Sequence, residues 1–151
     1  MRPLDLTTQR PRRATDTSAG GIVFLARTID KVRAQLPGSV LGSSLVTSEE
    51  FQTMSAALFR RLGIDEAEFR KLVGEAGDER EVVDWVLSRT TPETIAKWNE
   101  RIGGLCIEHL DHETKRHLKS LSPTVVSLPE NTPILEALDR EDDAAWAAAK
   151  R

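Results

Sequence analysis

The sequence predicts an all-α fold, a single compact domain of about six to eight short helices around a central N-terminal helix, with an extended N-terminal arm. Capping residues and helix-ending glycines and prolines recur along the chain. Between them, apolar residues repeat with the i, i+3, i+4 spacing of a buried helix face. The 151 residues are enough to bury one core. We therefore expect residues 1–18 to form an extended basic arm and residues 19–151 a single helical domain.

The expected central helix spans residues 20–36, the stretch that holds the longest apolar block of the chain. Its first two turns are apolar nearly all round, which is typical of a helix in the middle of a packed domain. Thr17 or Ser18 is expected to cap its start, and Pro37 and Gly38 to end it. The residues predicted to share its buried face are Ile22, Leu25, Ala26, Ile29, Val32 and Leu36.

Four helices with clear boundaries are expected between residues 47 and 103. The first begins with a T-x-x-E capping box, Thr47 and Glu50, and carries Phe51 on its apolar face. Asp65, Asp78 and Thr91 are the expected N-caps of the other three, the last followed by Pro92 at the first helical position. Trp85 and Trp98 fall on apolar faces, and we expect them in the core.

The C-terminal third has weaker signals. Residues 105–121 predict one charged helix with a thin apolar stripe, and residues 123–133 predict a loop that contains β-branched residues. Thr132 and Pro133 are expected to open a last helix.

The distribution of charge is more informative than the net value of −3. Residues 1–36 carry seven Lys or Arg and three Asp, a net charge of +4, so the remainder carries −7. Such an arm either contacts nucleic acid, is solvated, or lies on its own acidic body; we consider nucleic acid unlikely. The single cysteine, Cys106, favours a reducing, cytoplasmic setting, and no signal peptide or membrane span is expected.

Two segments resemble a known family. One is D-L-T followed by P-R-R, and the other is G-G-I-V-F-L-A-R-T-I-D-K-V-R-A. Together with L-G-I-D at residues 62–65, a run ending at Trp85, and Trp98-Asn99, they are similar to a bacterial family catalogued as domain of unknown function 5069. The resemblance covers residues 5 to about 102. It implies a single cytoplasmic domain and no activity. Many members continue L-G-E-Y where this chain has L-G-S-S at residues 41–44, so any function tied to that tyrosine is in doubt here.

Arg27, Asp30, Lys31 and Arg33 form the candidate ligand-binding site. They lie within two turns of the central helix, where partly buried charges must be paired. They could bind a phosphate or carboxylate, with Arg27 giving bidentate geometry. The alternative is an ion-pair network that locks the arm or a neighbouring helix, since such networks also concentrate charge.

All three histidines, His109, His112 and His117, lie within nine residues and close to Cys106. Imidazole and carboxylate groups bind first-row metals, but these side chains spread around most of a helix circumference and match no zinc-protease motif. We assign no metal site and no cofactor. Catalytic residues remain unknown, because the sequence contains no recognisable nucleophile with its base.

The leading functional hypothesis is therefore a cytoplasmic, non-enzymatic binding or protein-interaction domain that uses the arm and the charged face of the central helix. The alternative is a small enzyme or ligand-binding protein for an anionic metabolite, held by Arg27 and Lys31 in a pocket between helices. The expected partner is accordingly an unknown protein or a small anionic ligand. The sequence leaves oligomeric state open.

Overall fold

The computed structural model describes residues 1–40 and 53–150. This part of the chain is helical, and its only β-type pairings are two isolated bridges. The all-α prediction is thus confirmed. The α-helices are α1 (Leu25–Arg33), α2 (Met54–Leu62), α3 (Glu66–Glu75), α4 (Glu79–Arg89), α5 (Pro92–Gly103), α6 (His112–Leu121), α7 (Pro123–Val126) and α8 (Ile134–Ala149), with one 3-10 turn, η1 (Ile107–His109).

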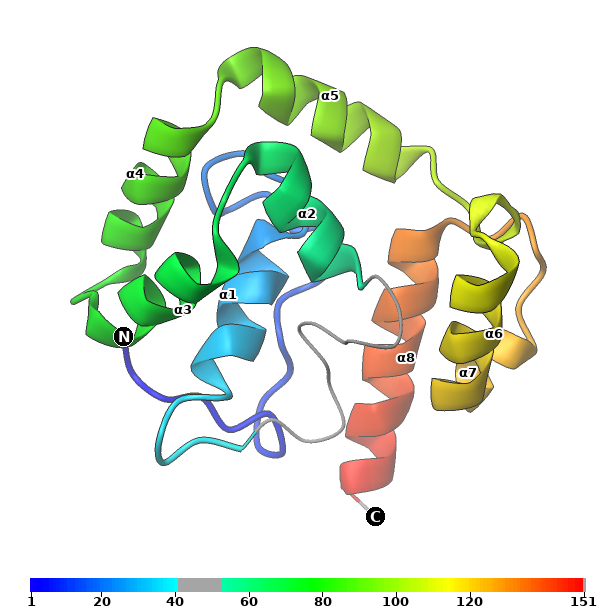
Figure 1. The fold of residues 1–151 in the computed structure, drawn as a ribbon. Coiled ribbons are helices and arrows are strands. Elements are labelled where there is room, and N and C mark those ends of the chain that lie inside the picture. The colour runs from blue at the N-terminus through cyan, green and yellow to red at the C-terminus, as the bar shows by residue number, and fades with distance from the viewer. Residues whose placement is uncertain (41–52, 151) are drawn as a thin grey trace.

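The helices pack compactly around α1, as Figure 1 shows. Helices α2 to α5 form an arch around α1, and α6, α7 and α8 stand beside it. All but one of the nine residues of α1 are buried. The predicted central position of the first helix is confirmed.

The boundaries predicted for that helix were wrong, because α1 begins only at Leu25. Gly20, Gly21 and Phe24 have φ values of 64°, 73° and 75°. These left-handed conformations interrupt a right-handed helix, and they suit glycine because it lacks a Cβ. Phe24 occupies the N-cap position and makes no side-chain capping bond, so neither of the two predicted capping residues caps this helix.

Helix α5 holds this irregular entry in place through the backbone. The Asn99 side chain accepts a hydrogen bond from the Val23 N–H at 3.0 Å and donates one to the Gly21 carbonyl at 2.9 Å. The Trp98 indole donates to the Val23 carbonyl at 2.9 Å and is 4% exposed. Trp98 is therefore a core residue as predicted, whereas Trp85 is only partly buried.

Three of the predicted N-caps are confirmed. Asp65, Asp78 and Thr91 each accept a hydrogen bond from the backbone N–H three residues later, which satisfies one of the free donors at a helix start. The capping box predicted at Thr47 and Glu50, together with Phe51, lies outside the described residues. The described helix α2 has Thr53 as its N-cap.

The C-terminal third differs from the prediction in two ways. The expected helix over residues 105–121 is divided into η1 and α6, because Asp111 starts a new helix by accepting the Thr114 N–H at 2.9 Å. The expected loop over residues 123–133 contains the short helix α7, whose first residue is Pro123 and whose Val125 is fully buried. Pro at the first helical position explains α7, since its fixed φ suits a helix start. The last helix begins next to Pro133, as predicted.

The N-terminal arm lies on the body of the protein. Leu4 is buried, its N–H donates to the Arg33 carbonyl, and its carbonyl accepts the Val40 N–H. The terminal ammonium of Met1 donates to the Val73 and Ala76 carbonyls at the C-terminal end of α3, at 2.8 and 2.6 Å. These contacts fix the path of the arm towards the charged residues of α1.

Candidate functional site

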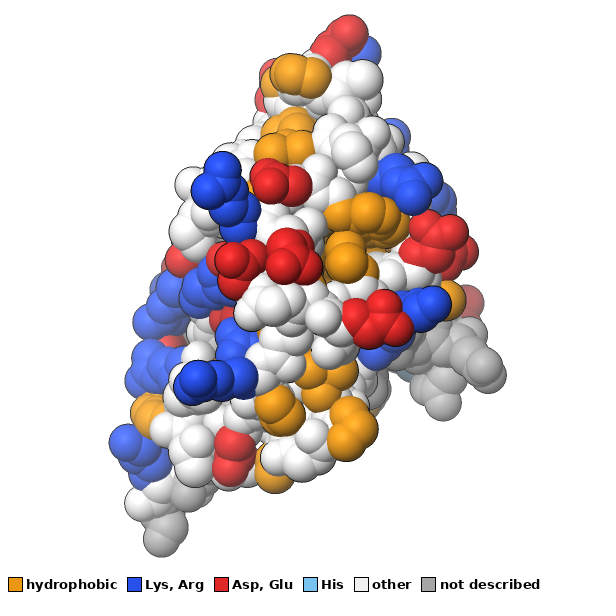
Figure 2. Space-filling model, turned by 90° about the vertical axis from the view of Figure 1, so that its left-hand side faces the viewer, with side chains coloured by type: hydrophobic (Ala, Val, Ile, Leu, Met, Phe, Trp, Pro, Cys, Tyr) orange, Lys and Arg blue, Asp and Glu red, His pale blue; other side chains and the backbone are white. Residues whose placement is uncertain are grey.

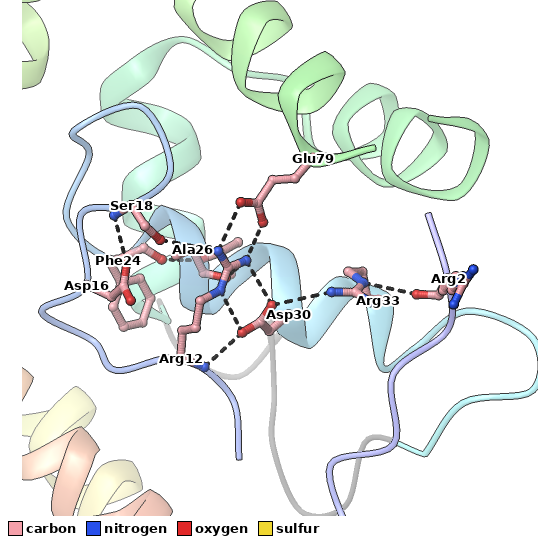
Figure 3. A network of polar contacts seen from close by, with 10 residues as sticks. Arg2, Arg12, Asp16, Ser18, Phe24, Ala26, Asp30, Arg33 and Glu79 are labelled. Carbon is pink, nitrogen blue, oxygen red and sulfur yellow. Dashed lines mark hydrogen bonds and ion pairs between the residues drawn. The ribbon is translucent and has the colours of Figure 1, made fainter. Parts of the chain in front are cut away.

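Arg12 of the arm joins the arm to α1 and α4 (Figure 3). Its guanidinium donates to both oxygens of Asp30, at 2.9 and 3.0 Å, and its backbone N–H donates to the same carboxylate at 2.8 Å. It also pairs with Glu79, the first residue of α4. The Asp30 side chain is only 6% exposed, so this fork of donors compensates a buried negative charge.

Arg27 joins α1 to α8. Its Nε and Nη2 donate to the two oxygens of Asp142, both at 2.9 Å, and the two side chains are 3% and 12% exposed. The guanidinium also lies 5.2 Å from the centre of the Phe24 ring. The Nη1 group of Arg27 makes no hydrogen bond within residues 1–40 and 53–150. Part of its donor capacity is therefore unused.

Arg33, near the end of α1, contacts the arm. Its Nε donates to the Arg2 carbonyl at 3.0 Å, and its Nη1 lies 3.8 Å from Asp30 (Figure 3). Like Arg12, it ties the arm to the central helix.

Lys31 differs from the other three candidate residues. It is 5% exposed, yet it forms no hydrogen bond or ion pair with any residue that the structure describes. The pKa of its amine is lowered from 10.5 to about 7, because burial and then the neighbouring Arg27 lower it more than Asp142 and Glu141 raise it. Desolvation penalises the ammonium form more than the two carboxylates stabilise it. At neutral pH the amine is thus divided between its charged and neutral forms.

Glu141 and Asp142 of α8 are the carboxylates whose charges act on Lys31, and neither forms an ion pair with it. Burial raises the pKa of Glu141, and the nearby Lys31 and Arg27 partly offset the rise. A carboxyl whose pKa is raised and an amine whose pKa is lowered thus act on each other. Such opposite shifts are typical of functional sites, although ion-pair networks also produce them.

The arrangement can bind an anion. Lys31 and Arg27 are buried residues one helical turn apart, and neither Lys31 Nζ nor Arg27 Nη1 has a hydrogen-bond partner in the described chain. Arg27 already holds one carboxylate, that of Asp142, in the bidentate geometry that suits a carboxylate or phosphate.

The sequence indicated the four charged residues of α1, but it did not reveal what pairs with them. Arg12 lies 18 positions from Asp30, and Asp142 lies 115 positions from Arg27. Glu79, which pairs with Arg12, lies 67 positions from it. The acidic run at residues 141–143 was the available signal, because a helix rich in carboxylates facing a basic segment predicts such pairs.

The histidine segment is held by local hydrogen bonds. His109 Nδ1 accepts the Cys106 N–H at 2.9 Å, and His117 Nδ1 is 2.9 Å from the Glu113 carbonyl. Among the described residues, no group of three or more His, Cys, Asp or Glu could hold a metal ion.

A groove of about 470 Å³ lies at the other end of the arm, beside the first turns of α8. Leu135 and Pro133 line it together with paired charges: Arg13 with Asp143, and Arg140 with Glu136. The arginines that line this groove already have partners.

In the described chain, no helix has the length and apolar character needed to cross a membrane. A comparison with curated proteins gives no match. The family described as "Domain of unknown function (DUF5069)" matches residues 8–143, which include residues 8–18 of the arm, the charged helix α1 and the Asp142 that pairs with it. Since the match covers most of the sequence, the chain belongs to this family.

Proposed function

We propose that this protein is a cytoplasmic binding protein for a small anionic ligand, a carboxylate or phosphate, with Lys31 as the principal cationic group and Arg27 beside it. The observation that supports this is Lys31, a buried residue whose amine has no partner in the described chain, whereas Arg27 and Asp30 on the same helix are paired. A structural role alone would place a paired or an apolar side chain there, since an isolated buried charge is costly.

The other charged residues of α1 have mainly structural parts in this proposal. Asp30 and Arg33 hold the arm, and Arg27 holds α8 through Asp142 while its Nη1 faces the ligand. Of the four candidate residues, Asp30 and Arg33 thus position the arm, and Lys31 and Arg27 bind the ligand.

The test is thermal unfolding at pH 6.5 with phosphate and a panel of small carboxylates, on wild type, Lys31→Met and Lys97→Met. Lys97 is the control because it is exposed and pairs with Glu93 within one helix. A ligand at 100 times its Kd adds about 2.7 kcal/mol to the free energy of unfolding. We expect at least one compound to raise the Tm of wild type and Lys97→Met but not of Lys31→Met. No shift in folded wild type, or an equal shift in Lys31→Met, contradicts the proposal.

A protein-interaction domain is the second candidate, and α6 favours it. This helix contributes no buried residue, and the nearby Leu121 and Val126 are 54% and 57% exposed. The basic residues Lys115, Arg116 and Lys119 along it pair with Glu130 and Glu113 on the surface, and an acidic amphipathic segment would compete for them. A labelled peptide of Glu and Leu residues should bind wild type and lose affinity with Leu121→Ser/Val126→Ser; equal binding excludes this surface.

The opposite side of the molecule gives the interaction hypothesis less support. On the face shown in Figure 2, hydrophobic side chains form small separate groups between acidic and basic ones. Scattered apolar groups of this kind are normal on a monomeric protein.

A further inference from the structure

The groove beside the first turns of α8 combines an apolar wall with charged side chains. Its volume of about 470 Å³ falls within the range of small-ligand sites, roughly 300–1,000 Å³. Leu135 and Asp139 both line it and lie one turn apart on α8, so this helix places an apolar and an acidic residue next to each other. Pro133, before α8, and Gly103, at the end of α5, also line the groove.

Most of the charges that line the groove are already paired. Arg13 donates to the Asp143 carboxylate at 3.2 Å, and Arg140 donates to the Glu136 carboxylate at 2.6 Å. Arg13 also donates to the backbone carbonyl of Asp139, at 3.4 Å, and not to its side chain. The groove thus has two guanidinium groups and three carboxylates, which gives its lining a net charge of −1.

Asp139 is the lining carboxylate that has no cation in the described chain. Its Oδ1 accepts the Ala14 N–H at 2.7 Å, whereas its Oδ2 accepts no hydrogen bond from residues 1–40 or 53–150. The side chain is half-buried, and burial raises the pKa of Asp139 more than the Ala14 N–H and the charges of Arg13 and Arg27 lower it. This carboxylate is therefore partly desolvated without a matching positive charge.

We propose that this groove binds a small primary ammonium ion with a short alkyl stem, its nitrogen on Asp139 Oδ2 and its stem against Leu135 and Pro133. An ammonium donates a charge-assisted hydrogen bond to a carboxylate oxygen, and removal of the stem from water adds affinity. The site is separate from the anion site of the proposed function, and its ligand has the opposite charge.

The single free oxygen of Asp139 favours an ammonium over a guanidinium. A guanidinium binds a carboxylate best through two parallel hydrogen bonds, as Arg27 does with Asp142. In Asp139 that geometry would displace the Ala14 N–H from Oδ1 and loosen the arm. An ammonium is a compact donor that can bind one oxygen alone.

The experiment is an NMR titration of the full ¹⁵N-labelled chain with hexylammonium, hexanol and hexanoate. The three probes share a stem and differ in the charge of the head group. We expect hexylammonium to shift the amides of residues 13–15 and 135–139 to saturation, with a Kd at least about tenfold below that of either other probe at these residues. Equal binding of hexanol, or no saturable shift with hexylammonium, overturns the inference.

One pair of variants tests the carboxylate. Asp139→Asn keeps an oxygen for the Ala14 N–H and removes the charge, so it should weaken hexylammonium binding at least about tenfold. Asp84→Asn is the control, because Asp84 is exposed and lies on α4, away from the groove lining. Hexylammonium binding that is the same in the two variants contradicts the inference.

A second pair of variants tests the groove itself. A Cβ on Gly103 meets no atom within 4 Å, so Gly103→Leu adds a side chain at the groove without a clash. The adjacent Gly104 does not line the groove, and its φ of −94° suits any residue, so Gly104→Leu is the matched control. Gly103→Leu should weaken hexylammonium binding severalfold and Gly104→Leu should not. Full binding in Gly103→Leu places the ligand elsewhere and overturns the inference.

Discussion

Lys31 lowers the stability of the folded protein relative to an apolar residue at this position, because its amine is desolvated. Its pKa of about 7 in the folded protein lies below the 10.5 of an ordinary lysine, so the unfolded chain binds more protons between these values. The free energy of unfolding therefore rises with pH through this window and is lowest, as far as Lys31 is concerned, below pH 7. One pKa unit corresponds to about 1.4 kcal/mol, so the full effect is at most about 5 kcal/mol.

Lys31→Met should remove this slope. We expect the variant to be more stable than wild type by a few kcal/mol at pH 6.5, and the difference to shrink as the pH approaches 10. Urea unfolding of both proteins at intervals of half a pH unit measures this difference. A stability difference that does not change between pH 6.5 and 10 contradicts a depressed lysine pKa.

Arg12 is a second residue with a large expected effect. Arg12→Met removes both guanidinium bonds to the buried Asp30 and leaves it the backbone N–H of residue 12 and the more distant Arg33. The free energy of unfolding should fall by about 3 kcal/mol. Arg80→Met is the matched control, because Arg80 is 87% exposed and pairs with Asp84 on the same helix. Chemical denaturation of both variants is the measurement. If the two variants lose the same free energy of unfolding, the contact between the arm and α1 does not stabilise the fold.

At the scale of elements, most helices could be predicted because their signals are local. Asp65, Asp78 and Thr91 each act on an amide three residues away, so the sequence alone reveals these helix starts. The start of α1 could not be predicted in this way. It depends on Trp98 and Asn99, which bind the backbone of residues 21–23 from more than seventy positions away.

The glycine pair before α1 provides a comparison within one turn. Both glycines have positive φ, so alanine at either position strains the backbone by about 1 kcal/mol or more. A Cβ on Gly20 would also lie 2.9 Å from Val83 Cγ1, whereas a Cβ on Gly21 meets nothing within 4 Å. Gly20→Ala should therefore have a lower Tm than Gly21→Ala. Calorimetry on the two variants measures the difference. Equal Tm values would show that Val83 moves aside without lowering the stability.

At the scale of the whole molecule, α8 attaches in two different ways. Its first turns bury Ile134, Leu135, Ala137 and Leu138, while residues 139–143 attach through polar contacts with the arm and α1. The site lies on the second, polar part. Which carboxylates of α8 meet which cations of α1 follows from tertiary packing, and for this reason the sequence predicted the residues of α1 without their partners.

Asp142→Asn should loosen this polar part. It leaves Arg27 with a buried, uncompensated charge, so we expect amides of residues 139–149 to exchange at least about tenfold faster while those of α5 keep their protection. Asp143→Asn is the control, since Asp143 pairs with exposed arginines and surface pairs contribute little. Hydrogen exchange followed by mass spectrometry resolves the segments. Equal exchange in the two variants would mean that Arg27 does not hold α8.

The most direct test of the account is a titration of the Lys31 amine by NMR, with isotope-labelled lysine and Lys31→Arg to assign the signal. We predict a pKa near 7 in the free protein and a clear increase when a bound carboxylate or phosphate stabilises the ammonium form. A Lys31 that titrates near 10.5, with or without added anions, would contradict the account, because the amine would then be an ordinary solvated or paired lysine.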